Sequence, residues 1–269
     1  MNKLSKKINE FGGNIEVPMP LFKAHAKRFD NRIVLVLRNQ LEEDFALFFL
    51  RMIEFYNWRA FGESLGSRRK PINRDDYLAW YDIIQDGFSY NERYFGMYIC
   101  SDMLMDFYKK YLPYGLTKEE RMVLKTFQSL GALRVDGIKI RKMPGIFADL
   151  IIVNEPYCLI SKYAPDGVLG HELSHMFYNH IPKYAKHVEN IFRGIKGEYK
   201  KKIVKILAAK DYTRNVMPEE WACNVIGERA TLNRMAYRLD DETKKKISSI
   251  KRMFRMNIKT MEDVNVKKQ

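Results

Sequence analysis

The 269-residue chain is 46% hydrophobic and 13% aromatic, which is enough to form a substantial buried core and argues against a disordered protein. It carries 47 basic and 33 acidic residues, which give a formal net charge of +14 at pH 7. No run approaches the roughly 18 apolar residues that cross a bilayer, and the first residues lack the apolar core of a secretion signal. We therefore expect a soluble, cytoplasmic protein without membrane segments.

Cysteine usage narrows the chemistry that the chain can support. Its three cysteines, Cys100, Cys158 and Cys223, are widely spaced and form no Cys-x-x-Cys pair. Neither a disulfide framework nor a thiolate zinc site is therefore expected. Any metal site has to be built from histidine and carboxylate side chains.

The basic residues occur in clusters, at positions 68–70, 200–205, 244–246 and 251–252. Such clusters suit a polyanionic partner such as nucleic acid, but lysine-rich helix faces exposed to solvent produce the same pattern more often. Charge alone therefore favours a solvated surface, and nucleic-acid binding is the alternative interpretation.

In chain order, the residues up to about Pro20 are expected to form a loose arm. Residues 32–61 carry long apolar helical periodicity, which predicts one or two helices, and the polar segment 62–71 predicts a loop. Residues 73–133 are again expected to be helical, with a capping box from Thr117 to Glu120 that opens one helix. Segments 132–140 and 145–161 are rich in β-branched and aromatic residues, and they predict strands.

The second half continues with an amphipathic helix that contains residues 168–180, a basic connector, and a last group of helices from Pro218 onward. This order predicts an α+β fold, mainly helical, with a small sheet that precedes the helix of 168–180. We divide the chain into a helical N-terminal region, residues 1–131, and a C-terminal domain, residues 132–269.

Residues 168–180, VLGHELSHMFYNH, place three of the five histidines around one glutamate. On a helix, His171 and His175 lie one turn apart on the same face, so both imidazoles can be aimed at one zinc ion. Glu172 lies on the adjoining edge, where it can take a proton from a zinc-bound water. The spacing therefore predicts a zinc site in preference to ordinary helix histidines.

The other histidines fit this site less well. His180 follows His175 by five residues and is displaced from the helix face that would point to the metal. We therefore expect His180 to lie beside the site, at the helix end or in solvent, and not to bind the metal. His25 and His187 lie in no motif and are expected to be surface residues.

A catalytic zinc usually has three protein ligands and a water, and the third ligand is expected in segment 212–228. Pro218 suits the first turn of a helix, and Glu219 and Glu220 follow it, although two acids there can simply complement the helix dipole. Small residues three and seven positions after Glu220 would let two helices approach closely, and Asn224 could accept a hydrogen bond from a ligand histidine. These positions favour Glu220 as the third ligand, with Glu219 as the alternative.

Peptide hydrolysis passes through an oxyanion that needs a hydrogen-bond donor. Tyr212 is the candidate donor in this segment, and His187 is a weaker one. The alternative for Tyr212 is a packed tyrosine without a catalytic role, as for many of the 16 tyrosines of the chain.

These residues resemble the gluzincin branch of zinc metallopeptidases, in which an HExxH helix, here HELSH at 171–175, is followed by a helix with a glutamate, here EEWACNVIG at 219–227. The resemblance implies that His171, His175 and Glu220 bind Zn²⁺ and that Glu172 is the general base. It also implies a zincin-like fold for the catalytic domain and a protein or peptide substrate.

Three families within this group share parts of the pattern, over residues 145–235. The spacing H-E-L-x-H-x-x-x-x-H is similar to the membrane CAAX-processing proteases, although this chain has no membrane spans. The later motif resembles the E-x-x-A-N of the ImmA/IrrE peptidases of phages and mobile elements, with Cys223 in place of their Ala and 226–227 in place of their Phe-Ala. The chain is also similar to the catalytic domain of anthrax lethal factor, where a tyrosine precedes the ligand glutamate by seven residues, as Tyr212 precedes Glu219.

We therefore predict a zinc-dependent metallopeptidase, of phage or mobile-element origin, in which Glu172 takes a proton from zinc-bound water and returns it to the leaving amine. The alternative is a basic protein that binds nucleic acid and has a structural or vestigial zinc site. An inactive structural or virion-associated protein is disfavoured by the intact glutamate.

Overall fold

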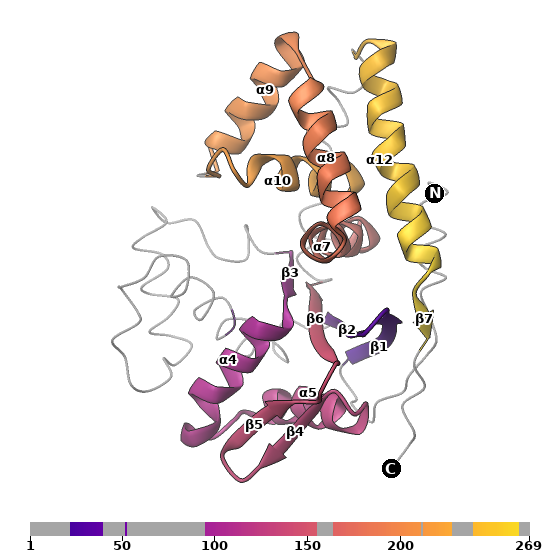
Figure 1. The fold of residues 1–269 in the computed structure, drawn as a ribbon. Helices are drawn as coiled ribbons and strands as arrows, with labels where there is room; N and C mark the ends of the chain where they lie inside the picture. The colour runs from indigo at the N-terminus through magenta and orange to yellow at the C-terminus, as the bar shows by residue number, and fades with distance from the viewer. Residues whose placement is uncertain are drawn as a thin grey trace. The chain divides into compact units, whose positions relative to one another are not determined.

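The computed structural model describes residues 22–39, 52, 95–154, 164–210, 212–227 and 239–263. These residues form a mixed architecture of α-helices and a small sheet, so the expected combination of helices and sheet is confirmed (Figure 1). The chain divides into two compact units. We call Gly12–Lys162 with Glu262–Gln269 the sheet unit, and Tyr163–Met261 with Met1–Phe11 the helical unit.

The sheet unit is built on five strands in the order β3-β6-β2-β1-β7. β2 and β6 run parallel, with Arg32 opposite Phe147 and Asn39 opposite Asn154, and the other neighbours are antiparallel. The strands are β1 (Phe22–Phe29), β2 (Arg32–Asn39), β3 (Gly96–Ile99), β6 (Phe147–Asn154) and β7 (Glu262–Asp263). A separate hairpin is formed by β4 (Leu133–Asp136) and β5 (Lys139–Lys142).

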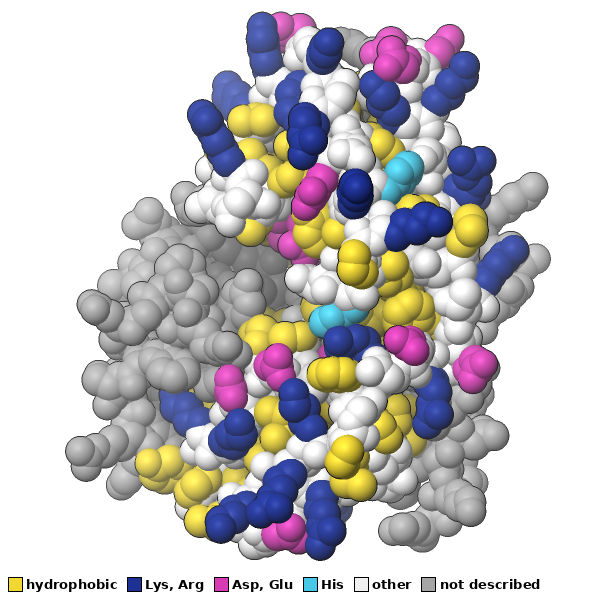
Figure 2. Space-filling view, viewed as in Figure 1, with side chains coloured by type: hydrophobic (Ala, Val, Ile, Leu, Met, Phe, Trp, Pro, Cys, Tyr) yellow, Lys and Arg dark blue, Asp and Glu magenta, His cyan; other side chains and the backbone are white. Residues whose placement is uncertain are grey.

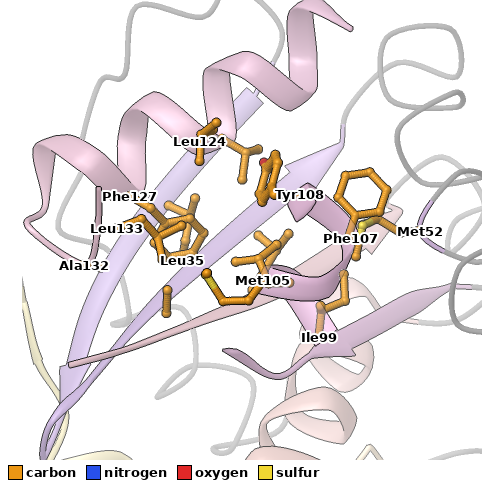
Figure 3. Packing of buried hydrophobic residues seen from close by; sticks show 14 of the residues in the cluster. Leu35, Met52, Ile99, Met105, Phe107, Tyr108, Leu124, Phe127, Ala132 and Leu133 are labelled. Atoms are coloured by element: carbon orange, nitrogen blue, oxygen red, sulfur yellow. The ribbon is translucent and has the colours of Figure 1, made fainter. Parts of the chain in front are cut away.

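Two helices, α4 (Ser101–Tyr111) and α5 (Lys118–Ser129), supply much of the core of the sheet unit. A short 3-10 helix, Leu112–Tyr114, follows α4. Figure 3 shows Tyr108 of α4 and Phe127 of α5 packed with Leu35 of β2. The predicted capping box opens α5, because Thr117 and Glu120 exchange side-chain to backbone hydrogen bonds of 2.8 and 3.2 Å.

The helical unit contains five described helices. They are α7 (Pro165–His180), α8 (Pro182–Gly194), α9 (Gly197–Ala208), α10 (Met217–Ile226) and α12 (Asp241–Lys259). Proline stands in the first turn of α7, α8 and α10, where its missing N–H costs no hydrogen bond. Aromatic contacts link the helices: Phe177 of α7 lies 5.4 Å from Phe254 of α12, and Phe192 of α8 lies 5.5 Å from Trp221 of α10, between ring centroids.

Three sequence-based predictions are wrong. Residues 32–39, expected to be helical, form strand β2, and residues 96–99 form strand β3. The basic connector after α7 is folded into helices α8 and α9. By its internal contacts the chain divides between Lys162 and Tyr163, and the pairing of β6 with β2 places residues 147–154 in the sheet unit. The expected domain boundary after residue 131 stays a prediction.

Several predictions lie outside the described residues: the arm up to about Pro20, the loop at 62–71, and helices at 40–51, 53–61 and 73–94. In the described part of the chain, no helix has the length and apolar character to cross a membrane.

Candidate metal centre

Helices α7 and α10 approach each other closely at a pair of glycines. A Cβ added to Gly227 would lie 2.8 Å from the carbonyl oxygen of Gly167 and 3.1 Å from the Cβ of His171. A Cβ added to Gly167 would lie 2.7 Å from the carbonyl oxygen of Gly227. Only glycine fits at both positions without a shift of the backbone, so the small residue expected seven positions after Glu220 has the predicted packing role.

This close approach brings Glu220 of α10 to the histidine pair of α7. The Nε2 atoms of His171 and His175 are 3.2 Å apart, with the ring planes at 71°. Glu220 Oε1 lies 3.5 Å from His175 Nε2, and Glu220 Oε2 lies 3.9 Å from His171 Nε2. One ligand atom from each of the three side chains therefore lies within 4.8 Å of the other two.

The spacing of these atoms fits a small tetrahedral metal. Zinc bonds of about 2.0–2.2 Å at tetrahedral angles place the ligand atoms roughly 3.3–3.6 Å apart. The 3.2 Å between the two imidazole nitrogens lies close to this range, and Glu220 presents a different oxygen to each of them, at 3.5 Å from His175 Nε2 and at 3.9 Å from His171 Nε2. Glu220 Oε2 is buried and accepts no hydrogen bond from the described residues, as expected for an oxygen meant for a cation. His171, His175 and Glu220 could thus hold a metal ion.

The second nitrogen of His175 is bound by the other acid of the pair. Glu219 Oε1 lies 2.8 Å from His175 Nδ1. The side-chain amide of Asn179 donates to the same carboxylate oxygen at 2.9 Å and to the backbone carbonyl of His175 at 2.9 Å. Asn224, the partner expected from the sequence, instead donates to the backbone carbonyl of Glu220 at 2.6 Å.

The electrostatic surroundings of His175 favour positive charge. Burial lowers the pKa of His175, but Cys223, Glu219 and Glu220 outweigh it, so the pKa lies well above the usual value of histidine. Burial raises the pKa of the Cys223 thiol to about 11, so at pH 7 the thiol is neutral and acts on His175 through a hydrogen bond, while the negative charge beside the ring comes from Glu219 and Glu220. The two carboxylates that favour a proton on the ring also favour a cation placed beside it.

Comparison of the chain with models of protein families, with curated proteins and with solved structures found no match. The candidate metal centre is therefore described by its own geometry and chemistry. Within the described residues, it combines two imidazoles and one carboxylate.

The remaining predicted residues lie in different parts of the helical unit. Glu172 follows His171 on α7 and is only 7% exposed. Tyr212 is half-buried in the segment before α10, where its backbone N–H donates to the carbonyl of Leu207 at 3.2 Å, and its catalytic role stays a prediction. His180 is the last residue of α7, which agrees with the expected place at a helix end.

Among the described side chains, His187 does not belong to the group that could hold a metal. His187 Nε2 lies 2.6 Å from Ser249 Oγ of α12, and the side chain is partly exposed, in agreement with the expected surface position. Burial and then the charge of Arg252 lower the pKa of His187. His25 lies on β1, and its side chain is outside the described part of the structure.

Sequence reasoning missed three polar residues near the motif. Asn179 stands four positions after His175, a spacing that could have indicated a contact on the same helix face. Ser174 Oγ lies 2.9 Å from the hydroxyl of Tyr184, and both side chains are fully buried. This contact joins α7 to α8 at the residue that precedes His175, and no local sequence pattern indicates it.

Proposed function

We propose that this protein is a zinc-dependent metallopeptidase. The observation that carries the proposal is the convergence of His171, His175 and Glu220, with ligand atoms 3.2 to 3.9 Å apart in the described pairs. A zinc ion held by these two histidines and this glutamate would supply Lewis-acid chemistry and would lower the pKa of a bound water. This ligand set is typical of catalytic sites, because structural zinc sites usually have four protein ligands.

Glu172 is the general base in this proposal. Glu172 follows His171 on α7 and is only 7% exposed, and its proposed role is to take a proton from the attacking water. The same carboxylic acid then returns the proton to the leaving amine. Tyr212 is the proposed hydrogen-bond donor to the developing oxyanion.

Metal analysis tests the centre directly. We expect stoichiometric zinc in wild-type protein purified without chelator, and its loss in His171→Ala and Glu220→Ala. Glu189→Ala is the matched control, because Glu189 is an exposed acid on α8 that hydrogen-bonds Tyr178. Two histidines and a carboxylate also bind iron(II), so iron and zinc should be measured together.

Hydrolysis of labelled, denatured casein by the same samples tests the activity. Cleavage should require zinc, stop after treatment with chelator, and be absent in the two ligand variants. Wild-type protein without zinc, or cleavage that persists in His171→Ala, would exclude the proposed function.

A second candidate function follows from the charge on α12. Lys245, Arg252 and Lys259 are exposed and spaced by seven residues, about 10 Å apart along one helix face. Arg255 lies on the same side, and in the described part of the structure none of these four forms an ion pair, whereas Lys246 pairs with Glu242. Figure 2 shows Lys and Arg side chains over much of the helical unit. We propose that this basic face binds the phosphate backbone of duplex DNA.

The dependence of DNA affinity on salt tests this second function. Each phosphate contact contributes about 0.9 to the slope of log K against log salt, so a triple serine variant at 245, 252 and 259 should lower the slope by roughly 2–3. Fluorescence anisotropy of a labelled duplex measures it. The control replaces three exposed lysines of the sheet unit, Lys118, Lys125 and Lys139, and an equal effect there would exclude the face on α12.

A further inference from the structure

We propose that Glu219 is a positioning residue, held in place by Asn179, that fixes the imidazole of His175 with its proton on Nδ1. The inference rests on the metal centre of the proposed function, but it does not depend on peptide hydrolysis. It gives the two adjacent acids different roles: Glu220 faces the metal, and Glu219 orients one of its ligands.

The geometry forms a closed hydrogen-bonded ring around His175. Glu219 Oε1 lies 2.8 Å from the Nδ1 atom, and Asn179 Nδ2 lies 2.9 Å from that same oxygen. Asn179 also donates to the backbone carbonyl of His175 at 2.9 Å, one helical turn earlier on α7. The carboxylate is thus held by two donors, and both belong to the helix that carries the histidines.

This arrangement decides which nitrogen can bind a metal. A neutral imidazole has one N–H, and a carboxylate only accepts hydrogen bonds, so the proton of His175 must lie on Nδ1. The lone pair is then on Nε2, which is the atom 3.2 Å from His171 Nε2 and 3.5 Å from Glu220 Oε1. Carboxylate partners of this kind orient metal-binding histidines and raise their basicity.

The ring also explains why Glu219 is the less suitable ligand. Consecutive residues of a helix point about 100° apart, so Glu219 and Glu220 reach His175 from different sides. The Oε1 atom of Glu219 already accepts two hydrogen bonds, one from each neighbour on α7. Glu220 Oε2, in contrast, is buried without a hydrogen bond from the described residues.

Zinc affinity, measured by competition with a chromophoric chelator, separates the roles. Glu219→Ala should bind zinc at the same stoichiometry with about 10–100-fold weaker affinity. Glu219→Gln, which keeps an acceptor oxygen of the same reach, should fall between it and wild type, and Asn179→Ala should weaken binding less than Glu219→Ala. Glu220→Ala should lose stoichiometric zinc, and Glu189→Ala should match wild type.

Nitrogen-15 NMR of His175 gives a readout that a merely structural role would not change. The Nδ1–H form should predominate in wild type, both with zinc and in metal-free protein at a pH where the ring is neutral, and should lose its dominance in metal-free Glu219→Ala. Unchanged zinc affinity in Glu219→Ala, complete loss of zinc as in Glu220→Ala, or an Nε2–H ring in wild type would overturn the proposal. Wild type that binds no zinc would exclude the proposed function, and the metal-free NMR measurement would still test the role of Glu219.

Discussion

Glu172→Gln is expected to keep the full zinc content of wild type and to hydrolyse peptide bonds at least about 100-fold more slowly, because general base catalysis contributes about 10²–10⁴-fold. Glutamine has nearly the same shape as glutamate, so the packing of this side chain on α7 should be preserved. Its amide cannot take a proton from water at neutral pH. The comparison requires zinc analysis and casein cleavage rates on the same preparation.

The outcome distinguishes a role of Glu172 in catalysis from a role in forming the metal centre. Glu189→Gln makes the same chemical change at an exposed position of α8 and should leave cleavage unchanged. If Glu172→Gln cleaved at the wild-type rate, another group would have to take the proton. If it lost zinc as well as activity, Glu172 would be needed to form the metal centre, and its role as the base would lose this support.

Gly227→Ala is expected to lower the free energy of unfolding by about 1–3 kcal/mol, the usual cost of overpacking, and to weaken zinc binding. The new Cβ would lie 2.8 Å from the Gly167 carbonyl oxygen and 3.1 Å from the His171 Cβ, so α10 must move away from α7. That movement would carry Glu220 away from the histidine pair. Urea denaturation of metal-free protein and chelator competition measure the two effects.

Gly194→Ala is the matched control for this substitution. Gly194 also lies at a helix end, on α8, and a Cβ there would meet only the flexible Lys246 side chain, at 3.6 Å. We expect little loss of stability or zinc affinity in this variant. Equal effects of the two substitutions would show that the contact between α7 and α10 does not position the metal centre.

The sequence predicts local helices of this fold well and strand β2 poorly. β2 lies between β1 and β6, and Ile33 through Leu37 are all buried. A strand covered on both faces gives a continuous apolar run, which periodicity cannot distinguish from a buried helix. Helices α8 and α9 are not predicted, for a different reason. Their sequences are rich in lysine and indicate a basic connector, although apolar residues such as Tyr184, Val188 and Ile191 are buried.

In the candidate site, too, the residues set by local helix geometry could be predicted from the sequence, and those set by distant contacts could not. The spacing of His171 and His175 is set within one helical turn, and the sequence is sufficient to place both on one face. The choice between Glu219 and Glu220 depends on how α10 is rotated about its axis against α7, more than 40 residues away. Contacts such as the Gly167–Gly227 approach set that rotation, and a single sequence does not contain them explicitly.

One kinetic consequence follows from the position of His175 between two consecutive acids. Glu219 contacts Nδ1 and Glu220 lies next to Nε2, so both sides of the ring are held by a single turn of α10. Rotation of the imidazole about its Cβ–Cγ bond would break both contacts at once. If the centre holds a metal ion, its release through rotation of this ring would require both contacts with α10 to break, and the rate of metal exchange would then depend on the motion of that turn.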